Sequence, residues 1–327
     1  MRTTFLLLIV VLLTCAQAPA GAQQPRKVPE IGIIGQAYPR SPILQSFRHG
    51  LRELGYVEGQ NIILDPRPRG VISQFHNFAA DFVRLKVDVI VALGPEAIGA
   101  AKAATKTIPI VATFRDDPVR LGQVASLERP GGNVTGVSGL TLELGGKWLE
   151  LVKETIPSVK RVAVFWNRIA EEKFPLWRSL DSAARSLGVE LQWLHAGEGG
   201  YGWLNENLRK AEWRQADAFI VLPGFSSARN VKDIADYGLR NRLPGIFWRS
   251  DLDLDQIGGL MAYGANRYEQ SRRAAYVVDK ILKGAKPAEL PVELPKSFEL
   301  VINRKVANEL GITIPPQMLA WADHVFR

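Results

Sequence analysis

The stretch "VDVIVALGPEAIGAAKAATKTIPIVATF", from Val87 to Phe114, is the clearest indication of the fold class. It begins with an apolar run rich in Val and Ile, continues with an Ala-rich segment after Gly-Pro, and ends in a second apolar run. The pattern predicts a strand, a helix over residues 95–106 and another strand. Parallel neighbouring strands need a crossover connection, which is usually a helix. A strand–helix–strand pattern is therefore typical of two parallel strands. We therefore expect a βαβ unit whose strands are buried on both faces.

The same alternation extends in both directions. Upstream, "EIGIIG" from Glu30 and "NIILD" from Asn61 are expected strands with a helix between them, and "NVTGVS" from Asn133 closes this first series. A second series starts at Thr141, with strands expected at "RVAVFWN", "VELQWLHA", "ADAFIVLP" and "LPGIFW". Two series of similar size predict an α/β chain of two doubly wound lobes with a cleft between them.

The N-terminus has the pattern of a secretory signal peptide. Arg2 is followed by an apolar run from Phe5 to Leu13 and by small residues that end in Ala-Gly-Ala at position 22. The apolar run is too short for a membrane span, so we expect residues 1–22 to be removed and the mature chain to be periplasmic. Cys15 lies in a sequence that resembles a lipoprotein box, which leaves lipid anchoring as the less favoured alternative.

Cysteine content and charge exclude several classes of protein. Cys15 is the single cysteine of the 327 residues, so the mature chain is expected to hold no disulfide, thiol nucleophile or thiolate metal site. The net charge is +8, but Lys and Arg are spread along the whole length without a basic tail. Together with the export signal, this distribution argues against a nucleic-acid partner and favours a basic, solvated surface.

Catalytic and metal-binding motifs are absent from the sequence. The four histidines have no metal-ligand spacing, and there is no HExxH, G-x-S-x-G or Walker loop. Asp116 and Asp117 are adjacent and would point apart, so they make a poor acid–base pair. We predict a protein that is not an enzyme and needs no cofactor.

The carboxyl ends of the expected strands are the candidate binding site, because open parallel sheets bind ligands beyond those ends. Aromatic side chains, arginines and hydroxyls recur there. The candidate ligand-binding residues are Tyr38, Arg40, Gly94, Pro95, Phe114, Arg115, Asp117, Ser138, Asn167, Phe225, Trp248, Arg249 and Tyr263.

These residue types suit a small carboxylate with a flat or apolar body. An aromatic ring can stack on a planar ligand, and an Arg side chain can hold a carboxylate through two parallel hydrogen bonds. Each candidate also has a structural interpretation. Asp117 before Pro118 can cap the following turn, Phe225 can pack between lobes, and single arginines can be surface charges.

Several longer motifs resemble a known family. They are "GYVEGQNI", "LERPGGNVTGVS", "LELGGKWLELVKETIP", "ILKGAKPAELPVE" and "FELVINRKVANELGITIPP". In these motifs the chain resembles the ABC-transporter substrate-binding proteins of the tryptophan/tyrosine-binding-protein-like family. The resemblance covers nearly the whole mature chain. It implies a periplasmic binding protein of type I, with two Rossmann-like lobes joined by a hinge of three crossovers.

The resemblance also implies lobe boundaries and partners. The first lobe would comprise residues 28–138 and 259–290, and the second residues 139–258 and 291–327. Such a protein would be a monomer that binds an aromatic amino acid or a related small solute and delivers it to an ABC permease in the inner membrane.

Individual positions match the family pattern to different degrees. The family's Asp-Pro-Val matches at 117–119, its Thr-Gly-Val-Ser at 135–138, and its Tyr-Gly pair at 263–264. The loop at Gly94 matches the place of its ligand-facing turn, and Asn167 matches an Asn after a strand. The chain departs from the family at "QAYPRS" and at "DPRPRGV", and the added arginines, Arg67 among them, favour a more anionic solute.

Four functions can be compared on this basis. The first is solute capture for transport, and the second is a sensor whose closure is detected by a membrane kinase or chemoreceptor. The sequence does not separate these two. An enzyme is disfavoured because catalytic groups are missing. A transcription regulator is disfavoured because a DNA-binding headpiece is missing and because the chain carries an expected export signal. We rank transport first.

Overall fold

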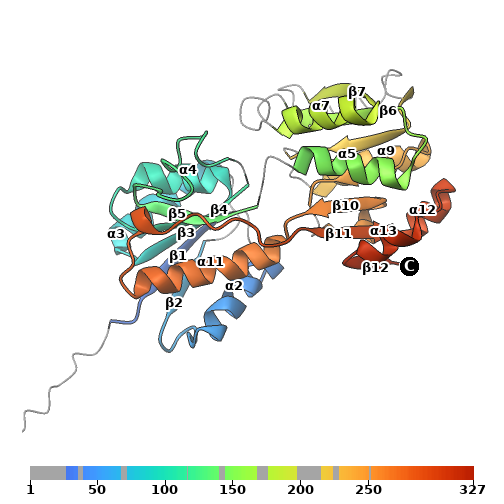
Figure 1. The fold of residues 1–327 in the computed structure, drawn as a ribbon. Coiled ribbons are helices and arrows are strands. Elements are labelled where there is room, and N and C mark those ends of the chain that lie inside the picture. Colours follow the sequence, from blue (N-terminus) through green and yellow to red (C-terminus); the bar gives the residue numbers. More distant parts are fainter. Residues whose placement is uncertain are drawn as a thin grey trace, which may run out of the picture.

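The structure is a computed structural model of the chain. It describes residues 27–35, 40–67, 72–115, 117–139, 144–167, 176–196, 215–223, 228–249 and 252–327. The expected signal peptide lies outside the described residues, as do Tyr38 and Phe225. The described residues form two α/β lobes, each built on its own sheet (Figure 1).

The first lobe is a parallel sheet with helices on both faces. Its strands, in the order β2-β1-β3-β4-β5, are β1 (Glu30–Gly35), β2 (Ile63–Pro66), β3 (Val89–Leu93), β4 (Ile110–Phe114) and β5 (Val134–Ser138). Its helices are α2 (Pro42–Glu53), η1 (Ile72–Gln74), α3 (Phe75–Leu85), α4 (Pro95–Ala104), α11 (Arg267–Leu282) and η3 (Pro287–Glu289). The expected βαβ unit is β3, α4 and β4, and its strands pair in parallel.

Consecutive residues of one strand enter two different hydrophobic cores. Ile33 of β1 belongs to the core that α2 and α11 cover, whereas Ile34 belongs to the core under α3 and α4. Side chains alternate between the faces of a sheet, so a strand buried on both faces must be apolar throughout. This is the physical reason for the continuous apolar runs of the sequence.

The second lobe has a larger, mixed sheet. Its strands, in the order β12-β11-β10-β9-β8-β6-β7, are β6 (Arg161–Asn167), β7 (Glu190–Ala196), β8 (Ala218–Val221), β9 (Gly245–Phe247), β10 (Met261–Gly264), β11 (Glu299–Asn303) and β12 (His324–Phe326). Its helices are α5 (Leu144–Thr155), α7 (Leu176–Leu187), α9 (Ala228–Arg240), α10 (Leu254–Ile257), α12 (Arg304–Leu310) and α13 (Pro316–Trp321).

The pairing of β10 with β11 is antiparallel, which differs from the parallel sheets that the sequence predicted. The reason is the path of the chain. It leaves the second sheet at the end of β10, passes through the first lobe as α11, and returns at the same edge to begin β11. A strand that starts where its neighbour ends must run in the opposite direction.

Three segments cross between the lobes, as expected, but two of the expected boundaries are wrong. Residues 261–264 form β10 of the second sheet, so the first lobe does not resume at residue 259. The backbone N–H of Val292 donates to Leu127, and that of Glu293 donates to Gly136, so these two residues still belong to the first lobe. The last crossing therefore lies between Glu293 and Glu299. No helix among the described residues has the length and apolar character needed to cross a membrane.

Candidate functional site

The carboxyl edges of both sheets lie where the crossovers join the lobes. The chain leaves the first sheet at the carboxyl end of β5 and the second sheet at the carboxyl end of β10. Since the strands of each parallel region end at one edge, the tips of β3 and β4 share that edge with β5, and the tip of β9 shares it with β10. These are the positions at which the sequence placed the candidate residues.

The turn from β3 into α4 brings two of the candidates together with Arg115. Gly94 has φ +100° and ψ 167°, a backbone conformation that is essentially restricted to glycine, and Pro95 is the first residue of α4. The N-cap residue of this helix, Gly94, has no side chain that could cap it. A β-carbon placed on Gly94 would lie 3.4 Å from the Arg115 guanidinium carbon. The Arg115 guanidinium, directly after β4, therefore packs over Gly94, the N-cap residue of α4.

Asp117 has the structural role that was its alternative interpretation. Its carboxylate accepts hydrogen bonds from the backbone N–H groups of Val119 and Arg120, at 3.0 and 3.1 Å. These bonds hold the turn that follows β4, as an Asx cap does. Asp117 thus fixes the loop directly after Arg115.

Two other candidates of the first lobe are buried. Phe114 is 1% exposed and packs with Phe75 and Ile98 in the core under α3 and α4, which corrects the expectation that its ring faces the cleft. Ser138 is also 1% exposed, and its backbone N–H donates to the Glu293 carbonyl at 2.8 Å. Ser138 therefore supports the last crossover, and its burial does not favour direct contact with a ligand.

The arginines near the first two strands differ from each other. Arg40 is exposed, directly before Ser41, whose hydroxyl caps α2. Arg67 pairs with Asp65 at 2.9 Å, and its guanidinium lies 4.9 Å from the Phe82 ring centroid on α3. These contacts give Arg67 a structural role in the first lobe, contrary to the expectation that it adds charge to the cleft.

At the carboxyl end of β9, Trp248 and Arg249 form a stacked pair. The Arg249 guanidinium carbon lies 5.6 Å from the Trp248 ring. Trp248 is 8% exposed, and its buried indole Nε1 has no hydrogen-bond partner among the described residues. A β-carbon on Gly264 would overlap the Trp248 carbonyl, so glycine is required where β10 passes this turn.

The last candidates, Tyr263 and Asn167, lie on β10 and β6, which are separated by β9 and β8 in the second sheet. The Tyr263 ring is half-buried with its centroid 5.9 Å from that of Phe298, and its carbonyl accepts a 2.7 Å hydrogen bond from Nε1 of Trp148. Burial raises the pKa of the Tyr263 hydroxyl above its ordinary value. Asn167 is the last residue of β6.

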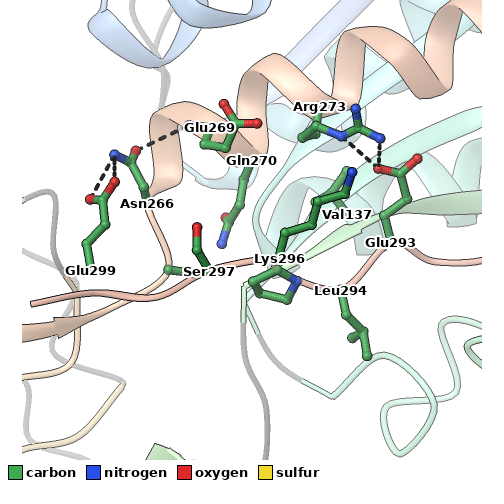
Figure 2. A pocket seen from close by; sticks show the side chains of 12 residues that line it. Val137, Asn266, Glu269, Gln270, Arg273, Glu293, Leu294, Lys296, Ser297 and Glu299 are labelled. Atoms are coloured by element: carbon green, nitrogen blue, oxygen red, sulfur yellow. Dashed lines mark hydrogen bonds and ion pairs between the residues drawn. The ribbon is translucent and has the colours of Figure 1, made fainter. Parts of the chain in front are cut away.

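Sequence reasoning missed a pocket at the hinge. It has a volume of about 570 Å³ and lies between the start of α11 and the last crossover (Figure 2). Its lining residues are Val137, Ala265, Asn266, Glu269, Gln270, Arg273, Glu293, Leu294, Pro295, Lys296, Ser297 and Glu299. The Pro-flanked segment "PVELPKS" was the available signal, but its partners are far away in the sequence. Within the described residues, no group of three His, Cys, Asp or Glu side chains could hold a metal ion.

Comparison with known proteins identifies the family. A family model described as "ABC transporter substrate binding protein" matches residues 38–326. The chain belongs to this family. The match spans both lobes and all three crossovers. The family is extracytoplasmic and consists of solute-binding proteins, so this ABC transporter substrate-binding protein is not an enzyme.

Similar proteins agree with the family and the fold. The chain is 28% identical over 270 residues to the tyrosine-binding protein of Clostridioides difficile (strain R20291), covering 82% of this chain and 76% of the relative. A ligand-free, open substrate-binding protein from Clostridium difficile is 25% identical, with a TM-score of 0.71 and coverage of 91% and 99%. An ABC domain in complex with L-Trp from Streptococcus pneumonia has a TM-score of 0.78 at 24% identity, with the same coverage. These likenesses confirm the two-lobed, type I periplasmic-binding-protein fold.

Proposed function

We propose that this protein is the extracytoplasmic solute-binding component of an ABC importer, and that it holds a small carboxylate-bearing solute between its lobes. The solute class is an aromatic amino acid or another aromatic or organic acid. The names of the relatives, which bind tyrosine and tryptophan, support the aromatic members of this class.

The observation that carries the proposal is the arrangement at the end of β3. The first turn of a helix has backbone N–H groups without partners in the helix, and the N-cap residue of α4, Gly94, has no side chain that could cap them. The Arg115 guanidinium lies against Gly94 at the same point. A helix N-terminus attracts an anion, and a guanidinium can bind a carboxylate through two hydrogen bonds. The two features together favour a carboxylate at this edge.

The second lobe supplies a different kind of contact. The Trp248 ring ends β9 at the edge that the crossovers join, and its buried N–H has no partner among the described residues. A buried donor without a partner costs about 1–3 kcal/mol, which an acceptor on a bound solute would recover. The exposed part of the ring would give an aromatic solute an apolar contact at this edge.

Contacts from two lobes make closure the consequence of binding. A solute that touches both edges shifts the equilibrium toward the form in which both contacts are made. The closed form would then be the form that a permease recognises. That partner, export through the signal peptide and a monomeric state remain predictions.

The test is a thermal-unfolding screen of the purified chain with aromatic amino acids, aromatic carboxylates, aliphatic mono- and dicarboxylates, and neutral sugars. A solute that binds only the folded state, present at a hundred times its Kd, should stabilise the protein by about 2.7 kcal/mol. We expect a shift in Tm with one of the carboxylates. Stabilisation by neutral sugars, and by none of the acids, would refute the proposed solute class.

A further inference from the structure

The start of α11 contacts the chain on both sides of the hinge. Asn266 is the second crossover's last residue before this helix, and its side-chain Oδ1 accepts from the backbone N–H groups of Tyr268 and Glu269, at 2.8 and 3.2 Å. It is therefore the N-cap of a helix that packs on the first lobe. The cap fixes the orientation of the Asn266 side chain.

The same side chain also reaches the second lobe. Its Nδ2 donates to both carboxylate oxygens of Glu299, at 2.9 and 3.0 Å. Glu299 is the first residue of β11, opposite Gly264 of β10 in the second sheet. Figure 2 shows Asn266 between the start of α11 and Glu299. One amide therefore links a first-lobe helix to a second-lobe strand.

Arg273 and Gln270, further along α11, contact the first lobe and Gly139, whose backbone N–H donates to Phe114 of β4. Arg273 pairs with Glu293 at 2.7 Å, and Glu293 in turn is bonded through its backbone to Gly136 of β5. Gln270, 8% exposed, packs so closely on Gly139 that a β-carbon there would overlap its amide. These contacts anchor α11, whereas the Asn266–Glu299 hydrogen bonds span the hinge.

We propose that Asn266 is a positioning residue, which sets the relative orientation of the two lobes through Glu299. The bond is charge-assisted, and both partners are held by secondary structure, so rotating the lobes about the crossovers must strain or break it. This inference rests on the proposed function in one respect: lobe orientation affects solute binding only if the solute lies between the lobes. The orientation itself can be measured without any solute.

The decisive variant is Asn266→Asp. Aspartate caps helices as well as asparagine does, so α11 keeps its cap. Its carboxylate cannot donate to Glu299, and two carboxylates at this distance repel each other. Glu299→Gln alone keeps an amide oxygen that accepts from Asn266. The double variant restores the bond with donor and acceptor exchanged.

The measurement is the distance distribution between two spin labels in the ligand-free chain. The label sites are Ala103→Cys on α4 and Ser182→Cys on α7, both exposed, in a Cys15→Ser background that removes the one native thiol. We expect Asn266→Asp to move or split the distribution, Glu299→Gln to leave it near the parent's, and the double variant to restore it.

Glu293→Gln is the matched control, because it weakens contacts that stay within the first lobe. It should lower Tm and leave the label distances unchanged. The proposal is overturned if Asn266→Asp gives the parent's distribution, if the double variant fails to restore it, or if Glu293→Gln shifts it equally. A shifted distribution together with a silent solute screen would leave the positioning role intact and refute only the solute class.

Discussion

The carboxyl edges of the two sheets present different chemistry. On the first sheet the edge carries a glycine in a restricted conformation, an uncapped helix start and the Arg115 guanidinium. On the second sheet it carries the Trp248 ring with the Arg249 guanidinium stacked on it. The first edge is suited to a negative charge, and the second to a flat ring with a hydrogen-bond acceptor. Under the proposed function, each lobe would recognise a different part of one solute.

The largest expected effect comes from removing one arginine at a time. Arg115→Ala should weaken the binding of a carboxylate found in the solute screen about tenfold to a hundredfold, because a hydrogen bond between charged groups contributes about 1.5–3 kcal/mol. Arg249→Ala should weaken it less, because its guanidinium stacks on Trp248. Isothermal titration calorimetry measures both, with the exposed Arg84→Gln on α3 as the control. Equal losses at Arg115 and Arg249 would contradict the division between the lobes.

The next effect tests the restricted glycine of the first edge. Gly94→Ala forces alanine into a conformation that costs about 1–3 kcal/mol and should lower Tm. Gly99 lies exposed on the same helix with no atom within 4 Å of an added β-carbon. Gly99→Ala should therefore raise Tm, because alanine is favoured over glycine inside a helix by about 0.5–1 kcal/mol. Thermal unfolding of the two variants compares them directly, and a Tm for Gly94→Ala at or above the parent's would show that this turn is not restricted to glycine.

The smallest effect concerns the indole of the second edge. Trp248→Phe keeps an aromatic ring in the core and removes the N–H, so affinity for an aromatic carboxylate should fall by up to about tenfold, the value of one neutral hydrogen bond. Trp321→Phe, on the exposed face of α13, is the control. If calorimetry gave Trp248→Phe the parent's affinity, the donor role of this indole would be wrong.

Patterns along the chain predicted the order of the elements and some of the local chemistry at their ends. The apolar runs predicted the βαβ units because parallel strands are buried on both faces, as Ile33 and Ile34 are. Gly94-Pro95 predicted a turn into a helix, and Asp117 before Pro118 left a cap as the alternative to ligand binding. These features depend on residues that are close in the sequence.

Which side chains face the site, and where the lobes join, depends on packing between segments that are distant in the sequence. Phe114 and Arg67 were expected near the site. Phe114 instead packs in the core under α3 and α4, and the Arg67 guanidinium lies against the ring of Phe82. The short strand β10 was assigned to the wrong lobe, because its four residues show no pattern that specifies a neighbour. The hinge contacts join residues as far apart as Ser138 and Glu293, which only folding brings together. Local preferences act over a few residues, whereas packing between distant segments decides what a strand end presents to a ligand.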